Sequence, residues 1–96
     1  MPKILIVEDQ VLIAHFLRDT LLKEGFSNIE IAFKINQAIE LVTHYEPEII
    51  LLDINVEGKD SGIIWAENYA LNKKIIFVTA QTERETMQKA LKVQPV

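Results

Sequence analysis

The sequence contains no cysteine, and only three glycines and three prolines among its 96 residues. The absence of cysteine excludes disulfides, thiolate metal sites and a cysteine nucleophile. So few glycines and prolines leave no room for a long linker or a low-complexity tract. Long apolar runs are missing too, since no stretch approaches the roughly 20 residues that a membrane span needs. We therefore expect ordered structure nearly from end to end and no binding to membranes.

Positive charge is also scarce. The sequence has ten Lys and Arg and fourteen Asp and Glu, which gives a net charge of −4. A nucleic-acid footprint needs a basic face that exchanges counterions with phosphates, so we expect this segment to bind no nucleic acid. The sequence opens on a strand pattern without a signal peptide, which predicts a cytoplasmic protein. Its length, with 49% hydrophobic and 25% charged residues, predicts a single domain over residues 1–96.

The most distinctive stretch is Ile49–Asp53, in which four bulky apolar residues are followed by a carboxylate. An uninterrupted apolar run is typical of a strand that is buried on both faces of a sheet. Lys3–Val7 is a second run of this kind, and it stops at Glu8 and Asp9. Ligands of open α/β sheets bind just outside the carboxyl ends of the strands, so these acids are candidates for chemistry.

Strand-like and helix-like stretches alternate along the chain. We expect strands over Lys3–Val7, Asn28–Ala32, Ile49–Asp53 and Lys74–Thr79. We expect helices over Gln10–Glu24, Gln37–Tyr45 and Ile63–Ala70, and from Glu83 onward. In the first helix, an apolar stripe is expected from Leu12, Ile13, Phe16, Leu17 and Leu21, with Gly25 closing the helix. Four repeats of strand then helix predict an α/β protein with a doubly wound parallel sheet, right-handed crossovers and helices on both faces.

Polar residues follow three of these strands, and parallel topology places all carboxyl ends at one edge. Glu8, Asp9, Asp53 and Thr79 should therefore converge. Neighbouring carboxylates raise the pKa of at least one of them unless a cation neutralises the group. Mg²⁺ is the expected cation, because it prefers carboxylate oxygens and leaves positions open for phosphate oxygens. An aspartate beside such an ion can attack phosphorus, and the Thr79 hydroxyl is available to the transferred group.

Taken together, these residues resemble the receiver domain of two-component response regulators. The resemblance rests on Glu8 and Asp9 after the first strand, Asp53 after the third, and Thr79 followed by Ala80 after the fourth. It covers the whole chain in order and spacing, and implies a flavodoxin-like receiver fold. It also implies that Asp53 accepts a phosphoryl group from a phosphohistidine on a histidine kinase or phosphotransfer protein. Such a chain is not an enzyme beyond catalysing its own aspartyl phosphorylation and dephosphorylation.

The resemblance implies a role for each residue at this edge. Asp9 and Asp53 would bind Mg²⁺ directly, and Glu8 would act partly through water. Asn55 would contribute its backbone carbonyl to the ion. Thr79 would hydrogen-bond the phosphoryl oxygens and carry the conformational switch.

The sequence departs from the family pattern at its end and in one loop. Family members have a fifth strand ending in Lys and Pro, and a fifth helix; Lys92 and Pro95 lie in or just after the fourth expected helix and are not that pair. With four βα units and the fifth missing, we expect Lys74–Thr79 to be a bare edge. We expect the chain to form a homodimer, either by pairing of this edge with a second copy or by exchange of the C-terminal helix. Val56 and Glu57 replace the usual Leu and Pro, a difference to which we give little weight.

Three other classes of protein stay open. A flavodoxin-like module that binds a nucleotide or FMN would need hydroxyls and glycines in the first loop, where Glu8 and Asp9 would repel phosphate. A phosphatase of the haloacid dehalogenase type would need a second Asp where Asn55 stands. The main alternative is a pseudo-receiver, which keeps the fold only as a protein-interaction or dimerisation module. It is favoured by the absence of the fifth-strand lysine that would pair with the phosphoryl group.

Overall fold

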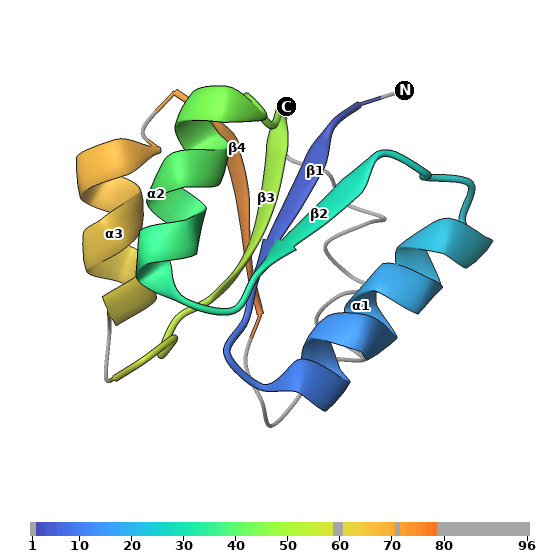
Figure 1. Cartoon of the computed structure of the whole chain (residues 1–96), viewed down its shortest axis with the longest axis horizontal. Helices are drawn as coiled ribbons and strands as arrows, with labels where there is room; N and C mark the ends of the chain where they lie inside the picture. Colours follow the sequence, from blue (N-terminus) through green and yellow to red (C-terminus); the bar gives the residue numbers. More distant parts are fainter. Residues whose placement is uncertain (1, 59–60, 71, 79–96) are drawn as a thin grey trace.

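The computed structural model describes residues 2–58, 61–70 and 72–78, which form four strands and three helices (Figure 1). The strands are β1 (Ile4–Val7), β2 (Ile29–Ala32), β3 (Ile49–Asp53) and β4 (Lys74–Val78). The helices are α1 (Val11–Lys23), α2 (Ile35–His44) and α3 (Ser61–Tyr69). The expected alternation of strand and helix is confirmed over these ranges. Thr79 and the helix expected from Glu83 lie outside the described residues.

All four strands run parallel in one sheet, in the order β2-β1-β3-β4. Ile4 at the start of β1 is aligned with Ile29 of β2 and Ile49 of β3. The carboxyl ends of the strands therefore share one edge of the sheet, the lower edge in Figure 1. This order confirms the predicted doubly wound α/β fold of the flavodoxin-like kind.

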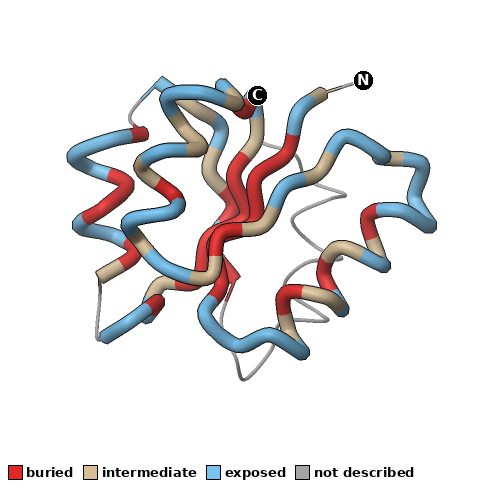
Figure 2. Tube along the Cα trace, viewed as in Figure 1, coloured by how far each residue is buried: buried red, intermediate tan, exposed pale blue. Residues whose placement is uncertain are grey.

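Helices cover both faces of the sheet, with α1 on one side and α2 and α3 on the other (Figure 1). The strands between them are mostly buried, whereas the outer faces of the helices are exposed (Figure 2). Side chains of β1 and β3 alternate between two cores, which explains their uninterrupted apolar runs. The core under α2 and α3 includes Leu5, Val7, Ala38, Ile50, Leu52, Trp65 and Ala66. The core under α1 includes Ile4, Ile6, Ala14, Leu17, Leu21 and Leu51.

Helix α1 buries a narrower stripe than its apolar residues suggest. Its buried residues are Ala14, Leu17 and Leu21, which follow one another at steps of three and four on a single face. Leu12 is 85% exposed and Phe16 is 39% exposed. The prediction that these two belong to the buried stripe is wrong, because their positions on the helix turn them away from the sheet. No helix within the described ranges is long and apolar enough to cross a membrane.

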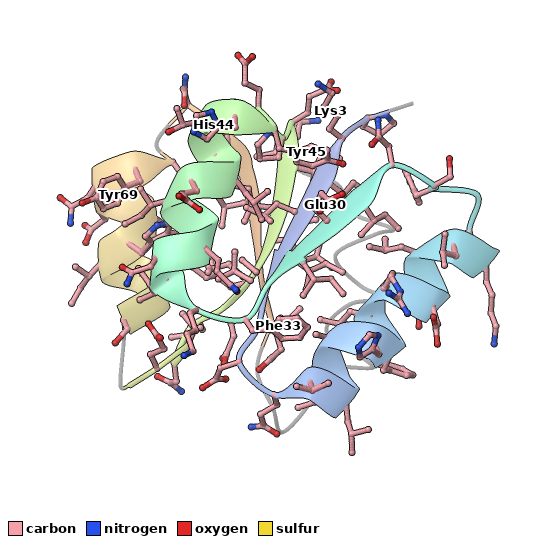
Figure 3. The ribbon with its side chains drawn as sticks, in the orientation of Figure 1. Lys3, Glu30, Phe33, His44, Tyr45 and Tyr69 are labelled. Atoms are coloured by element: carbon pink, nitrogen blue, oxygen red, sulfur yellow. The ribbon has the colours of Figure 1, made fainter. Side chains whose placement is uncertain are left out.

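The amino edge of the sheet, opposite the acidic residues, is held by Tyr45 at the end of α2. Its hydroxyl donates to the backbone oxygen of Asn28 (2.7 Å), with Asn28 Oδ1 2.9 Å away. The Lys3 ammonium lies 5.7 Å from the centroid of the Tyr45 ring (Figure 3), a cation–π contact. These contacts join the connection after α2 to the starts of β1 and β2.

Candidate functional site

Three carboxylates meet at the carboxyl edge of the sheet. Glu8 and Asp9 follow β1, and Asp53 ends β3, the strand hydrogen-bonded to β1. One carboxylate oxygen from each residue lies within 4.8 Å of the others. Glu8 is 2% exposed and Asp53 is 8% exposed, whereas Asp9 is exposed. The structure therefore brings together three of the residues that the sequence indicated, from stretches far apart in the chain.

Backbone amides orient all three carboxylates. Three main-chain N–H groups each donate to one of them: Gln10 to Glu8 Oε2 (3.0 Å), Asn55 to Asp53 Oδ1 (3.1 Å) and Glu57 to Asp9 Oδ2 (3.3 Å). A hydrogen bond of this kind favours the ionised form of the acid that accepts it. The loops after β1 and β3 thus hold the acids with their oxygens converging.

The pKa of Glu8 is raised in this arrangement. Burial is the main cause that raises the pKa of Glu8 from 4.5 to about 7. The Gln10 N–H opposes this rise, while Asp53 and Asp9 add to it. A proton therefore neutralises part of the cluster near neutral pH. A hard cation bound between the carboxylates would compete with that proton, since the two stabilise the same negative charge.

Asn55 lies in the loop that leaves β3, two positions after Asp53. Besides its N–H contact with Asp53, its carbonyl oxygen accepts a hydrogen bond from Gly58 N–H at 3.0 Å. A carbonyl oxygen has two lone pairs and can accept from an N–H and contact an ion at the same time. Thr79, the fourth residue expected at this edge, lies outside the described residues.

Gly62 is a positioning residue that the sequence patterns described above do not identify. It lies in the first turn of α3, and its N–H donates to the carbonyl oxygen of Ile54 at 2.7 Å. A Cβ atom here would overlap the Asp53 carbonyl oxygen and lie 2.9 Å from that of Ile54. Only glycine lets α3 begin this close to the end of β3. A glycine beside a helical pattern was the available signal.

Glu57 was also missed, and was given little weight as a departure from the family pattern. Its N–H contacts Asp9, and its Oε2 accepts a hydrogen bond from Ile35 N–H at 3.1 Å. Its φ of 62° is rare for a residue with a side chain. No local sequence pattern predicts these contacts, because they join segments that are distant in the chain.

Other polar and hollow features lie away from the acids. The ring of His15 lies 6.3 Å from that of Phe33, and His44 is exposed at the end of α2. A groove of about 270 Å³ between α2 and α3 is lined by Ile39, Trp65 and other residues. Neither histidine is part of the described acidic cluster.

The strand order and the carboxylate cluster together define the class of protein. It is a doubly wound α/β protein with a candidate cation site beside a buried aspartate, at the edge where such folds bind ligands. The profile of the response regulator receiver domain matches residues 4–95. The chain belongs to the response regulator receiver domain family.

Relatives and solved structures agree with this assignment. Sporulation initiation phosphotransferase F of Bacillus subtilis (strain 168) is 33% identical over 90 residues, which are 92% of this chain and 72% of that protein. The signal receiver domain of a modulated diguanylate cyclase from Desulfovibrio desulfuricans G20 is 34% identical, with a TM-score of 0.74 over 99% of this chain and 77% of that one. The MaeR response regulator bound to beryllium trifluoride is 29% identical, with a TM-score of 0.73 over 95% and 77%.

Proposed function

We propose that this chain is a phosphoacceptor in two-component signalling and that Asp53 receives the phosphoryl group. The observation that carries the proposal is the buried Asp53 carboxylate, whose oxygen lies within 4.8 Å of oxygens of Glu8 and Asp9 at the carboxyl edge. Two relatives support it. One is named a phosphotransferase, and MaeR was solved with beryllium trifluoride, a compound that imitates a phosphoryl group in size and charge.

The donor set of the cluster fits Mg²⁺. It offers hard carboxylate oxygens, and a cation would compensate the negative charge of Asp53 and Asp9, which adds to the larger effect of burial on the pKa of Glu8. Asp9 and Asp53 would hold the ion directly, Asn55 through its carbonyl oxygen, and Glu8 partly through water. When bound, the ion would neutralise charge on the transferred phosphoryl group.

Asp53 is the nucleophile in the proposed reaction. A carboxylate oxygen forms a bond to phosphorus while the bond between phosphorus and the donor imidazole nitrogen breaks. The electron pair of the broken bond goes to the imidazole, and a proton from solvent keeps the released histidine neutral. Asn55 N–H holds Asp53 Oδ1 in place during the transfer. Attack of water on the acyl phosphate later restores the carboxylate and releases phosphate.

The proposed partners follow from this chemistry. The donor is a histidine kinase or a phosphotransfer protein that carries phosphohistidine, and a cytoplasmic location belongs to the same proposal. Thr79, next in the chain after β4, would hydrogen-bond the phosphoryl group and switch the conformation. A pseudo-receiver, which would bind partners without accepting phosphate, is the alternative that the experiment must separate.

Phosphorylation by a small donor tests the proposal. The chain is incubated with Mg²⁺ and acetyl phosphate, and its intact mass is measured under mild conditions. We expect a single phosphoryl adduct that disappears in Asp53→Asn and when the divalent cation is chelated. Asp19→Asn is the matched control, because Asp19 is an exposed residue of α1 whose described ion pair is with Arg18. A folded chain without an adduct would support the pseudo-receiver.

A further inference from the structure

Glu57 occupies a backbone conformation that a residue with a side chain rarely adopts. Its φ is 62°, in the left-handed region where Cβ crowds the backbone, and the residue is exposed. The left-handed conformation does not by itself stabilise an exposed glutamate. Contacts that the conformation permits must therefore stabilise it.

Two such contacts connect Glu57 to different parts of the fold. Its main-chain N–H donates to Asp9 Oδ2 at 3.3 Å, and its side-chain Oε2 accepts from Ile35 N–H at 3.1 Å. The first partner belongs to the acidic cluster after β1, and the second is the first residue of α2. A proline at this position could make neither contact, because it has no N–H and no carboxylate.

The contact with Ile35 supplies what α2 lacks locally. The first N–H groups of a helix have no partner within the helix, and a side chain just before the helix often accepts from one of them. Lys34, which precedes α2, makes no such hydrogen bond, and the first turn of α2 contains no acidic residue. The Glu57 carboxylate, which belongs to a loop distant in the sequence, does both. It accepts the hydrogen bond from Ile35 N–H, and it places a negative charge near the N-terminus of α2.

We infer that Glu57 is a positioning residue that couples the Asp9 carboxylate to the first turn of α2. One residue in a strained conformation holds both hydrogen bonds, so the loss of either weakens the support for the other. If the Asp9 oxygen turns toward another partner, Glu57 N–H loses its acceptor and the cap on Ile35 loosens. By linkage, a change at the start of α2 acts back on Asp9 to the same extent. The coupling rests on the proposed function in one respect only. That function supplies the cation that would draw the Asp9 oxygen away from Glu57 N–H.

Hydrogen exchange of the Ile35 amide in the cation-free protein tests the coupling. Glu57→Ala keeps the residue's Cβ but removes the acceptor, and we expect about fivefold faster exchange at Ile35, the effect of losing a helix cap. Asp9→Ala should speed exchange at the same amide, although the described hydrogen bond of Asp9 is with Glu57 N–H and not with Ile35. The double variant should be no faster than Glu57→Ala alone, because both substitutions break one linkage.

Conservative and matched variants separate this role from a general loss of structure. Glu57→Gln and Asp9→Asn keep an acceptor oxygen and should retain most of the protection at Ile35. Glu46→Ala is the control, since Glu46 is also an exposed glutamate with positive φ (52°), and its N–H donates to Leu41 within the turn that ends α2. Amides of β1 report any change in global stability.

Two results would overturn the inference: exchange at Ile35 that is unaffected by Asp9→Ala, or effects of the two alanine variants that simply add. The measurement uses neither Mg²⁺ nor a phosphodonor. Its failure would therefore leave the proposed phosphorylation of Asp53 standing, and a failed phosphorylation would leave the coupling standing.

Discussion

A Cβ atom at Gly62 would overlap the carbonyl oxygen of Asp53, so the first turn of α3 touches the backbone of the proposed phosphoacceptor. The Gly62 N–H also donates to Ile54 O at 2.7 Å, which fixes the backbone just after Asp53. Because Gly62 has no side chain, α3 can pack against the backbone of Asp53 and hold it in position.

Gly62→Ala should destabilise the fold although alanine favours helices. Propensity alone would stabilise α3 by about 1 kcal/mol, whereas forcing a methyl group against fixed backbone costs about 1–3 kcal/mol, and more here because the neighbours are carbonyl oxygens. We expect a net loss of about 2 kcal/mol in urea unfolding. Glu67→Ala, at an exposed position of the same helix, should change stability by less than about 0.5 kcal/mol. A stabilised Gly62→Ala would contradict the contact.

The raised pKa of Glu8 predicts that the cation-free protein loses stability as pH rises. The pKa of about 7 lies above the ordinary 4.5, so between these values the folded state binds more protons than the unfolded one. The contribution of Glu8 to the free energy of unfolding should then fall from about pH 4.5 to 7 and stay low above pH 7. The contribution of Glu8 is on the order of 3 kcal/mol.

Glu8→Gln isolates this contribution. The difference in unfolding free energy between the wild type and the variant should change by that amount between pH 4.5 and pH 8 when measured in urea with a chelator present. Added Mg²⁺ should reduce the change, since a cation favours the ionised form of Glu8. Parallel pH profiles for the two proteins would show that Glu8 titrates normally.

The exposed start of α1 predicts where a phosphohistidine donor docks. Asp53 lies at the carboxyl edge, and α1 begins there with the exposed Val11 (54%) and Leu12 (85%), two and three positions after Asp9. Leu12→Gln should slow phosphotransfer from a phosphohistidine protein about tenfold through lost apolar contact, and leave acetyl phosphate reactivity unchanged. Leu22→Gln, near the other end of α1 and 48% exposed, is the control. Equal effects of the two variants would contradict this docking site.

Self-association through β4 stays a prediction from the sequence. Among the described strands β4 is last in the sheet, and its Phe77 is 38% exposed. An open edge with high β propensity pairs readily with another strand, and a charge on it opposes pairing. Sedimentation velocity should show association that rises with concentration and weakens in Phe77→Glu but not in Ile64→Glu, an exposed position of α3. A clean monomer at high concentration would refute the homodimer.

The sheet and the convergence of its acids were predictable because both follow from local patterns and parallel topology. The apolar run before Asp53 predicted a strand buried on both faces, and β3 is that strand. Once the strands were known to be parallel, the meeting of Glu8, Asp9 and Asp53 followed. The expectation that Gly25 closes the first helix is also confirmed, since Gly25 follows α1 with a φ of 97°.

The features of the fold and site that were not predicted depend on spatial relationships between segments, which no local sequence pattern encodes. Leu12 and Phe16 matched helical spacing, but only Ala14, Leu17 and Leu21 of α1 are buried, and Leu12 and Phe16 are both exposed. The contacts of Glu57 depend on a left-handed backbone and on two segments that meet only in the folded chain. Gly62 required knowing how closely α3 approaches β3.

The most direct test of the account is to locate the acyl phosphate. After reaction with Mg²⁺ and a phosphodonor, borohydride reduces an aspartyl phosphate to homoserine, and peptide mass spectrometry then identifies the converted residue. If Asp53 is the phosphoacceptor, conversion should occur at Asp53 alone, with none when the phosphodonor is omitted. Conversion at Asp9 or at another acid, with Asp53 intact, would contradict the assignment of Asp53 as the phosphoacceptor.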